Sequence, residues 1–206
     1  MIICGVDDAG RGSVLGPLVI AGVSVDRTKI THLSEIGVKD SKQLSPKMRE
    51  ILYKKIIAIV DDYYVAKISP KIIDQSVHKN QLNHLEAKYM AKVIAKLQPS
   101  SSYVDSCDVN PVRFGKEISK LANCGKIFSR HHADSKFAIV SAASIVAKVN
   151  RDREIEKLRK KHDLGSGYPS DPKTMKFIKD WILEYDKTPE FVRKSWKPVK
   201  MMLALI

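Results

Sequence analysis

The chain has 206 residues, enough to bury one sizeable hydrophobic core, and its 44% hydrophobic and 29% charged residues are typical of a globular protein. The formal net charge of +13 favours a polyanionic partner, although solvated helix faces would account for part of the charge. No apolar run reaches the roughly 18 to 20 residues of a membrane span, and no signal peptide opens the chain. We therefore expect a cytoplasmic protein without a membrane partner.

The first half of the chain alternates predicted strands with predicted helices. Residues 2–6 and 17–25 are rich in Val and Ile and predict two strands, joined by a glycine-containing turn. Ser45 and Pro46 together predict the start of a helix with an apolar stripe. A further strand is expected over "YYVAKIS" and a helix over about 80–97.

The second half repeats this alternation and ends in helices. "SSYVDS" predicts a short strand that ends at Asp105, Asn110 and Pro111 begin a helix, and "KIFSR" predicts another strand. After the polar turn "HHADS", a long helix is expected from near Phe137 to the glycines at 165 and 167. Another helix begins after Asp171, and a basic aromatic tail follows. Interleaved strands and helices predict an α/β fold around one central sheet, with C-terminal helices as an added layer.

Cysteine usage argues against a disulfide framework. The chain has three cysteines, an odd number, and none of them forms a CxxC pair. This pattern does not predict a thiolate zinc site and fits a reducing compartment.

Four carboxylates fall where an open sheet usually places its ligands. Asp7 and Asp8 are expected to close the first strand, Asp105 closes a later strand, and Asp134 lies in a turn before a helix. Carboxylates from separate segments on one sheet edge could hold one or two Mg²⁺ ions through oxygen ligands. Taken singly, Asp134 is a plausible helix cap and Asp105 a turn residue, but adjacent acids beside an apolar strand repel each other unless a cation lies between them.

Residues 10–12 read Gly-Arg-Gly and follow the paired acids directly. The superficial match to a dinucleotide-binding fingerprint is rejected, because that motif must open a helix and the residues that follow here predict a strand. Glycines let the backbone approach a ligand closely, and Arg11 offers planar donors to a phosphate or a sugar hydroxyl.

Three other features have both a structural and a functional interpretation. Tyr168, set between Gly167 and Pro169, could stack on a sugar or a base pair, or could pack in the core. The loop "KDSK" could contact phosphate or could simply be solvated. His131 and His132 fit turn residues better than ligands, although His132 could shuttle a proton near Asp134.

The order of these motifs resembles that of type 2 ribonuclease H, or ribonuclease HII, of the archaeal kind. The resemblance rests on five collinear stretches and covers almost the whole chain: "GVDDAGRGSVLGPLVIAG", "VKDSKQLS", "YVDS", "HHADSKFAIVSAASIVAKVNRDREI" and "GSGYPSDPKT". It implies a ribonuclease H-like fold with a central mixed β-sheet flanked by helices. It further implies a catalytic domain over residues 1–170 and a helical extension, packed on it, over 171–206.

The resemblance also implies an activity and a set of site residues. The activity would be metal-dependent hydrolysis, with Mg²⁺ or Mn²⁺, of the RNA strand of RNA–DNA hybrids, and cleavage of DNA duplexes at single embedded ribonucleotides. Nothing in the sequence suggests more than a monomer. Substrate contacts would come from the GRG motif, which reads the 2′-hydroxyl, from Tyr168 at the RNA–DNA junction, and from a phosphate-binding loop. The implied metal-binding and catalytic residues are Asp7, Asp8, Asp105 and Asp134, and the implied substrate-binding residues are Gly10, Arg11, Gly12, Lys39, Ser41, Lys42 and Tyr168.

One position departs from the family pattern. The residues alone also leave two other functions possible. The family usually has Glu where this chain has Asp8, and a side chain shorter by one methylene puts the role of Asp8 in question. A nucleic-acid-binding protein without catalysis would explain the charge but not the converging acids. A related metal nuclease acting on DNA would explain the acids but would not need the GRG motif and Tyr168.

Overall fold

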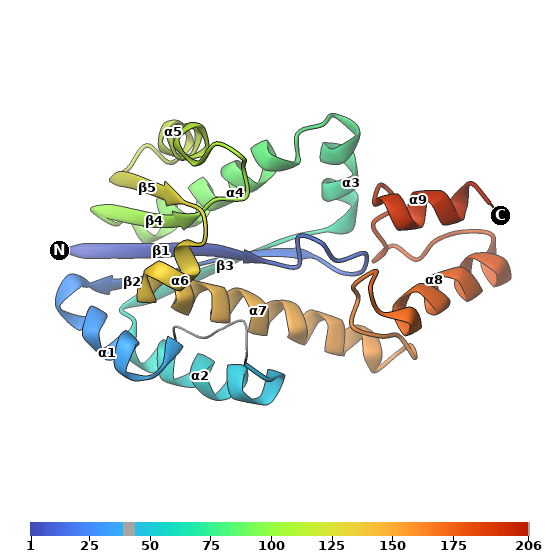
Figure 1. Ribbon diagram of the computed structural model, residues 1–206, viewed down its shortest axis with the longest axis horizontal. Coiled ribbons are helices and arrows are strands. Elements are labelled where there is room, and N and C mark those ends of the chain that lie inside the picture. Colours follow the sequence, from blue (N-terminus) through green and yellow to red (C-terminus); the bar gives the residue numbers. More distant parts are fainter. Residues whose placement is uncertain (39–43, 206) are drawn as a thin grey trace. The chain divides into compact units, whose positions relative to one another are not determined.

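The computed structural model describes residues 1–38 and 44–205, in which strands and helices alternate (Figure 1). The strands are β1 (Ile2–Ala9), β2 (Leu18–Asp26), β3 (Asp62–Ile68), β4 (Ser101–Asp105) and β5 (Lys126–Arg130). The helices are α1 (Ile30–Glu35), α2 (Pro46–Ile59), α3 (Pro70–His78), α4 (Leu82–Leu97), α5 (Pro111–Ala122), α6 (Ala133–Lys136), α7 (Ala138–Arg159), α8 (Pro172–Tyr185) and α9 (Lys197–Leu203), with a 3₁₀ turn over Arg27–Lys29.

The strands form one mixed sheet, as predicted. Their order is β3-β2-β1-β4-β5; β1 pairs antiparallel with β2 and parallel with β4, and β4 pairs parallel with β5. The last parallel pair of β1 and β4 is Val6–Val104, and the next residues along the two strands are Asp7 and Asp105. The sheet register therefore brings the ends of β1 and β4, with their carboxylates, to the same edge.

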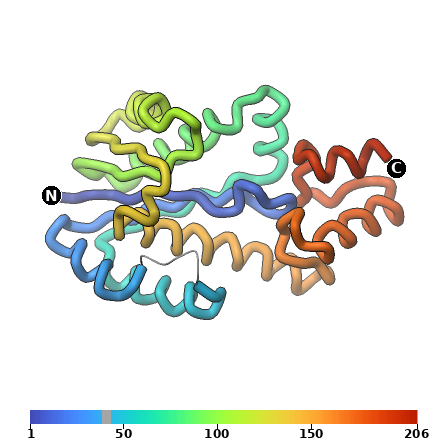
Figure 2. The backbone as a smooth tube through the Cα atoms, viewed as in Figure 1, coloured from blue at the N-terminus to red at the C-terminus, as the bar shows by residue number. Residues whose placement is uncertain are grey.

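Contacts divide the chain into two compact units. Unit 1 comprises Met1–Ala9, Val19–Ala66 and Asn83–Asn150, and unit 2 comprises Gly10–Leu18, Lys67–Leu82 and Arg151–Ile206. Figure 2 follows the segments of unit 2 by colour, from blue through teal to orange and red. A compact unit is defined by contacts and not by catalysis, so the functional boundary after residue 170 stays a prediction.

Unit 1 holds most of the sheet and the larger hydrophobic core. Figure 1 shows α4 and α5 on one face of the sheet and α1, α2 and the first part of α7 on the other. Gly5 lets α7 lie directly on β1, because a Cβ atom there would be 2.2 Å from the carbonyl oxygen of Ile139. On the opposite face, a Cβ atom at Gly22 would be 2.4 Å from Val93 of α4. Small residues thus set the spacing of both helix layers.

Unit 2 has its own apolar core. Leu15 forms an isolated bridge with Val192, so a segment from near the N-terminus lies beside the C-terminal region. The buried core residues are Val14, Leu15, Ile155, Leu164, Ile178, Ile182, Val192 and Val199.

The predicted helix starts are confirmed where a capping residue precedes proline. Ser45 accepts a hydrogen bond from the backbone N–H of Met48 at 3.3 Å, and Asn110 accepts one from Arg113 at 3.0 Å. Asp171 caps α8 in the same way.

Several element boundaries differ from the predictions. β1 continues through Asp7 and Asp8 to Ala9, because these residues pair with β2, so the two acids lie within the strand's last residues. α7 ends at Arg159 and not at the glycines at 165 and 167. The helices α1, α3 and α9 were not predicted, and Asp134 lies in the short helix α6 where a turn was expected.

Candidate active site

Asp7 is a buried carboxyl with a strongly perturbed pKa. Asp7 is only 5% exposed, and its Oδ1 accepts a hydrogen bond from the backbone N–H of Asp8 at 2.8 Å. Burial, and next the negative charge of Asp105, raise the pKa of Asp7 to about 7, with a smaller contribution from Asp134. A hydrogen bond from Ser144 of α7 partly opposes this rise. The Asp7 carboxylate therefore lies close enough to two other acids to be repelled by them.

Asp105 ties the end of β4 to the segment that carries Asp134. Its Oδ1 accepts a hydrogen bond from the backbone N–H of Ala133 at 2.6 Å, at the start of α6. His132, just before α6, adopts a left-handed conformation with φ of 54° and so turns the chain into this helix. Asp134 follows in the first turn of α6 and is buried, with 5% exposure. Three acids from β1, β4 and α6 thus meet within unit 1.

Asp8 differs from Asp7 in its placement. It pairs with Ile20 of β2 and is half-buried. Because side chains alternate along a strand, the side chain of Asp8 leaves β1 on the face opposite to that of Asp7. Asp8 donates a hydrogen bond from its backbone N–H to the Asp7 carboxylate. A metal-binding role of the Asp8 side chain stays a prediction.

The three acids offer the oxygen donors that a hard divalent cation takes, but they do not form a ready metal site. Within residues 1–38 and 44–205, no three His, Cys, Asp or Glu side chains already surround a common ion position. The donor set is nevertheless all oxygen, and a cation would offset the repulsion that raises the pKa of Asp7. Mg²⁺-like ions keep several waters and need few carboxylates, which suits an open group of acids.

The two histidines of the polar turn are surface residues. His131 and His132 are both exposed, and a ring nitrogen of His131 lies 3.3 Å from the carbonyl oxygen of Val109. This placement agrees with the interpretation as turn residues, and the proton-shuttle hypothesis for His132 stays untested.

The Gly-Arg-Gly segment forms a tight turn in unit 2 and does not open a helix. The backbone N–H of Ser13 donates to the carbonyl oxygen of Gly10 at 3.2 Å, and Gly10 has a φ of 84°, a value that favours glycine. Arg11 is partly exposed. Gly12 is exposed, and a Cβ atom there would meet no other atom within 4 Å. The need for glycine at position 12 therefore does not come from packing.

Tyr168 lies beside this turn within the same unit. It follows Gly167, whose carbonyl oxygen accepts hydrogen bonds from the backbone N–H groups of Val14 at 2.8 Å and Leu15 at 3.2 Å. Tyr168 is half-buried. The guanidinium carbon of Arg151 lies over its ring, 4.3 Å from the ring centre. The structure thus brings together residues 10–12 and Tyr168, which are predicted to bind the substrate. The other predicted substrate-binding residues, Lys39, Ser41 and Lys42, lie outside the described residues.

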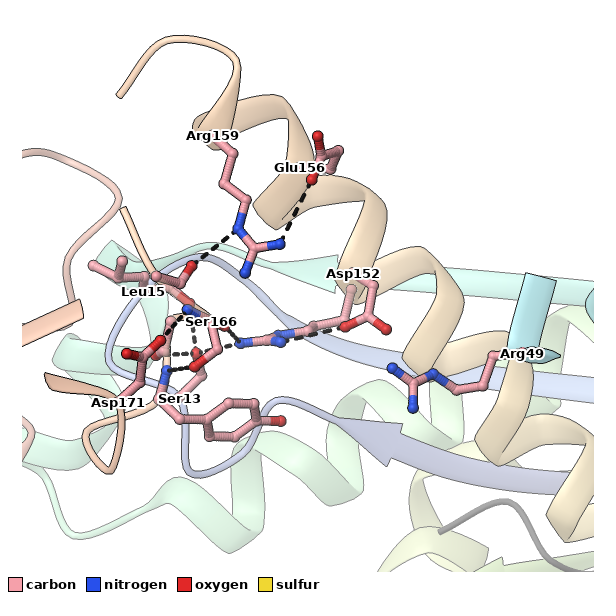
Figure 3. Close-up of polar contacts among 12 residues, drawn as sticks. Ser13, Leu15, Arg49, Asp152, Glu156, Arg159, Ser166 and Asp171 are labelled. Atoms are coloured by element: carbon pink, nitrogen blue, oxygen red, sulfur yellow. Dashed lines mark hydrogen bonds and ion pairs between the residues drawn. The ribbon is translucent and has the colours of Figure 1, made fainter. Parts of the chain in front are cut away.

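Sequence reasoning missed the polar residues that support these motifs. Arg151 and Arg193 are buried cations of unit 2, and Arg193 donates to the carbonyl oxygen of Arg11 at 3.0 Å. Asp171 accepts a hydrogen bond from the backbone N–H of Ser166 at 2.5 Å, which fixes the loop before Tyr168 (Figure 3). Among many basic residues in the C-terminal third, nothing in the sequence distinguishes a buried arginine from a solvated one.

None of the described helices combines the length and the apolar character that crossing a bilayer requires.

Comparisons with known proteins identify the family. A family profile described as "Ribonuclease HII" matches residues 4–199. A ribonuclease HII of Cenarchaeum symbiosum is 51% identical over 204 residues, covering 99% of both chains. The crystal structure of ribonuclease H2 from Pyrococcus horikoshii OT3 has a TM-score of 0.93 and 45% identity, covering 100% of this chain and 98% of that one. An RNase HII from Archaeoglobus fulgidus, solved in complex with PCNA, has a TM-score of 0.89 and 41% identity, covering 96% of each chain.

These matches extend over the sheet, the acids and the GRG turn alike, and they confirm the resemblance read from the five collinear motifs. They also decide against a binding protein without catalysis and against a nuclease specific for DNA. The chain belongs to the ribonuclease HII family, metal-dependent endoribonucleases that hydrolyse the RNA strand of RNA–DNA hybrids.

Proposed function

We propose that unit 1 performs the hydrolysis, with Asp7, Asp105 and Asp134 as the central acids and Mg²⁺ or Mn²⁺ as the metal. The observation that carries this proposal is geometric: the sheet register brings the ends of β1 and β4 to one edge, and the backbone N–H of Ala133, next to Asp134, donates to Asp105 at 2.6 Å. Burial, and next the charge of Asp105 with a smaller effect of Asp134, raise the pKa of Asp7, and a bound cation would offset this repulsion. Perturbed carboxyl groups of this kind cluster at functional sites.

The acids would have different roles. Asp7 and Asp105 would bind the metal most directly, and Asp8 would lie beside the scissile phosphate. Asp134, in the first turn of α6, would assist the attacking water. When bound, the metal would make a water more nucleophilic and stabilise the leaving oxygen of the phosphodiester. The products would carry a 3′-hydroxyl and a 5′-phosphate.

Recognition of the ribonucleotide would belong to unit 2. The turn of Gly10, Arg11 and Gly12 would approach the 2′-hydroxyl and the neighbouring phosphate through its backbone, and Tyr168 would stack at the RNA–DNA junction. The open space around Gly12 supports such an approach, because its Cβ position meets no atom within 4 Å. Lys39, Ser41 and Lys42 would add phosphate contacts. The 2′-hydroxyl is the group that distinguishes RNA from DNA at any one position.

We further propose that the protein acts as a monomer in the cytoplasm, on RNA–DNA hybrids and on DNA duplexes with embedded ribonucleotides. The net charge of +13 supports a nucleic-acid substrate bound mainly through its phosphates.

Cleavage mapping tests the proposed function. A 5′-labelled DNA duplex with one ribonucleotide and a uniform RNA–DNA hybrid are incubated with Mg²⁺, with Mn²⁺ or with a chelator. Both substrates should be cut only with metal, leaving 3′-hydroxyl ends, and an all-DNA duplex should stay intact. Asp7→Asn and Asp105→Asn should each lower the rate at least 100-fold with little loss of binding. Normal turnover in either variant would contradict the assignment of the acids.

A further inference from the structure

We propose that Arg151 is a positioning residue that determines how well the enzyme recognises a single ribonucleotide. It would do so by fixing the GRG turn and Tyr168 relative to each other. This inference rests on the proposed function, because it assumes that these two motifs bind the ribonucleotide and its junction with DNA. Arg151 itself would not contact the substrate.

Arg151 connects the two motifs by direct contacts within unit 2. It is only 5% exposed, and its Nη2 donates to the hydroxyl of Ser13 at 3.0 Å and to the carbonyl oxygen of Ser166 at 2.7 Å. Its guanidinium carbon lies over the Tyr168 ring, 4.3 Å from the ring centre. One side chain therefore contacts the residue after the GRG turn, the loop before the tyrosine and the tyrosine itself.

A glycine of each motif lies close to the Arg151 side chain. Gly10 has a φ of 84°, and a Cβ atom there would lie 3.2 Å from Cγ of Arg151. Gly167 has a φ of 86°, and a Cβ atom there would lie 2.9 Å from Nη2. Both positions therefore favour glycine because of their backbone conformation, and a side chain at either one would also crowd Arg151.

Ser13 completes the connection. Its hydroxyl lies 2.7 Å from the carbonyl oxygens of both Leu15 and Gly167, to which it can donate, and it accepts from Arg151. Figure 3 shows Ser13, Ser166 and Asp171 converging below the part of α7 that carries Asp152 and Arg159. A shift of Arg151 would thus move the turn and the tyrosine loop together.

The geometry of the guanidinium explains why lysine could not replace it. A planar group can donate along its edge while its face stacks on an aromatic ring, whereas an ammonium is a point charge on a flexible stem. Small displacements of substrate-positioning groups reduce rates by as much as about 100-fold. We therefore expect Arg151→Lys to loosen the tyrosine and the turn without removing the positive charge.

The test compares two substrates in one enzyme. Rates are measured for wild type and Arg151→Lys on a DNA duplex with one ribonucleotide and on a uniform RNA–DNA hybrid. The ratio of the single-ribonucleotide rate to the hybrid rate should fall at least tenfold in the variant, because only the first substrate depends on an RNA–DNA junction at the tyrosine. A merely structural loss would lower both rates equally and leave the ratio unchanged.

Arg159→Lys is the matched control. Arg159 comes from the same helix and donates to the carbonyl oxygen of Gly165 at 3.1 Å, but its side chain is 44% exposed. The rate ratio should stay at the wild-type value in this variant. A fall in the ratio equal to that of Arg151→Lys would overturn the proposal.

Two further variants make the test independent of the folding of Arg151→Lys. Ser13→Ala removes the hydroxyl that accepts from Arg151 and should also lower the ratio. In Tyr168→Ala the ratio should fall, and adding Arg151→Lys should change it by less than about twofold, because the two residues act through one another. An unchanged ratio in folded Arg151→Lys or in Ser13→Ala, or independent effects in the double variant, would overturn the proposal. If wild type cuts neither duplex, the proposed function itself fails, which is a separate outcome.

Discussion

Asp7 shows at the level of one residue how a group of buried acids can conflict with stability. Its pKa of about 7, raised first by burial and then by Asp105, means that ionising this group opposes folding. A carboxyl whose pKa is raised on folding contributes stability below its unfolded value near 4, and this contribution is lost as the pH rises through about 7. In the presence of a chelator, the protein should therefore become less stable between pH 5.5 and pH 8.

Asp7→Asn should reverse this effect while abolishing cleavage. The amide is nearly isosteric and carries no charge, so the free energy of unfolding at pH 8 with chelator should rise by roughly 2–4 kcal/mol. Urea unfolding at pH 5.5 and pH 8 measures both values. The acids whose pKa is lowered, such as Asp108, are already ionised across this range and contribute little to the change. A variant no more stable than wild type at pH 8 would contradict the account of Asp7.

The sequence indicated the acids as candidates, whose catalytic role stays a prediction, but it did not indicate the residues that support them. Asp7, Asp105 and Asp134 were predicted because strand ends and helix starts are recognisable from local patterns. Ser144, which hydrogen-bonds to Asp7, and Arg151, which stacks on Tyr168, reach their partners through long-range packing. No local pattern distinguishes them from other serines and arginines of α7.

At the level of elements, the close contact between β1 and α7 brings Ser144 to Asp7. A Cβ atom at Gly5 would lie 2.2 to 2.7 Å from backbone atoms of Ile139 and Val140 at the start of α7. Because these atoms belong to the helix backbone, the whole helix would have to move, and with it Ser144.

Gly5→Ala should therefore lower the free energy of unfolding by about 3 kcal/mol or more, measured by urea unfolding. Gly12→Ala is the control, since a Cβ atom at Gly12 meets nothing within 4 Å, and its stability should equal that of wild type. Equal stability of Gly5→Ala and wild type would show that β1 and α7 are not packed as closely as described.

Element prediction succeeded at three boundaries where a capping residue precedes proline, although the same pattern at Ser69–Pro70, which begins α3, was missed. Ser45–Pro46, Asn110–Pro111 and Asp171–Pro172 each combine a side-chain cap with a residue suited to the first turn. The extension of β1 through Asp7 and Asp8 could not be predicted, because its hydrogen bonds come from the distant strand β2. α1 was missed for a different reason: Leu33 is its one buried residue, so it has no periodic apolar stripe.

At the level of the whole molecule, the division into two units could not be read from the sequence. Unit 2 combines residues 10–18, 67–82 and 151–206, segments that are far apart in the chain. Their association depends on long-range contacts such as the Leu15–Val192 bridge. The fold class was nevertheless predictable, because the alternation of strands and helices restricts a chain of this length to few architectures.

The net charge predicts a salt-dependent, sequence-independent affinity for duplexes. With a net charge of +13, the protein should neutralise at least two phosphates when it binds a duplex. Raising the salt from 50 to 200 mM should then lower its affinity for the duplex about tenfold or more. Fluorescence anisotropy with hybrids of two unrelated sequences, in the presence of Ca²⁺ or a chelator to prevent cleavage, measures this slope. A salt-independent affinity, or a strong preference for one sequence, would contradict binding through the phosphate backbone.

Metal binding tests the central claim most directly, namely that Asp7, Asp105 and Asp134 form one cation site. Free Mn²⁺ is followed by electron paramagnetic resonance while wild type, Asp7→Asn and Asp105→Asn are titrated at pH 8. Asp180→Asn serves as control, because this acid pairs with Lys176 on α8. We predict that wild type and the control bind Mn²⁺ alike and that both site variants bind at least tenfold more weakly. Wild-type affinity in Asp7→Asn and Asp105→Asn would contradict the account.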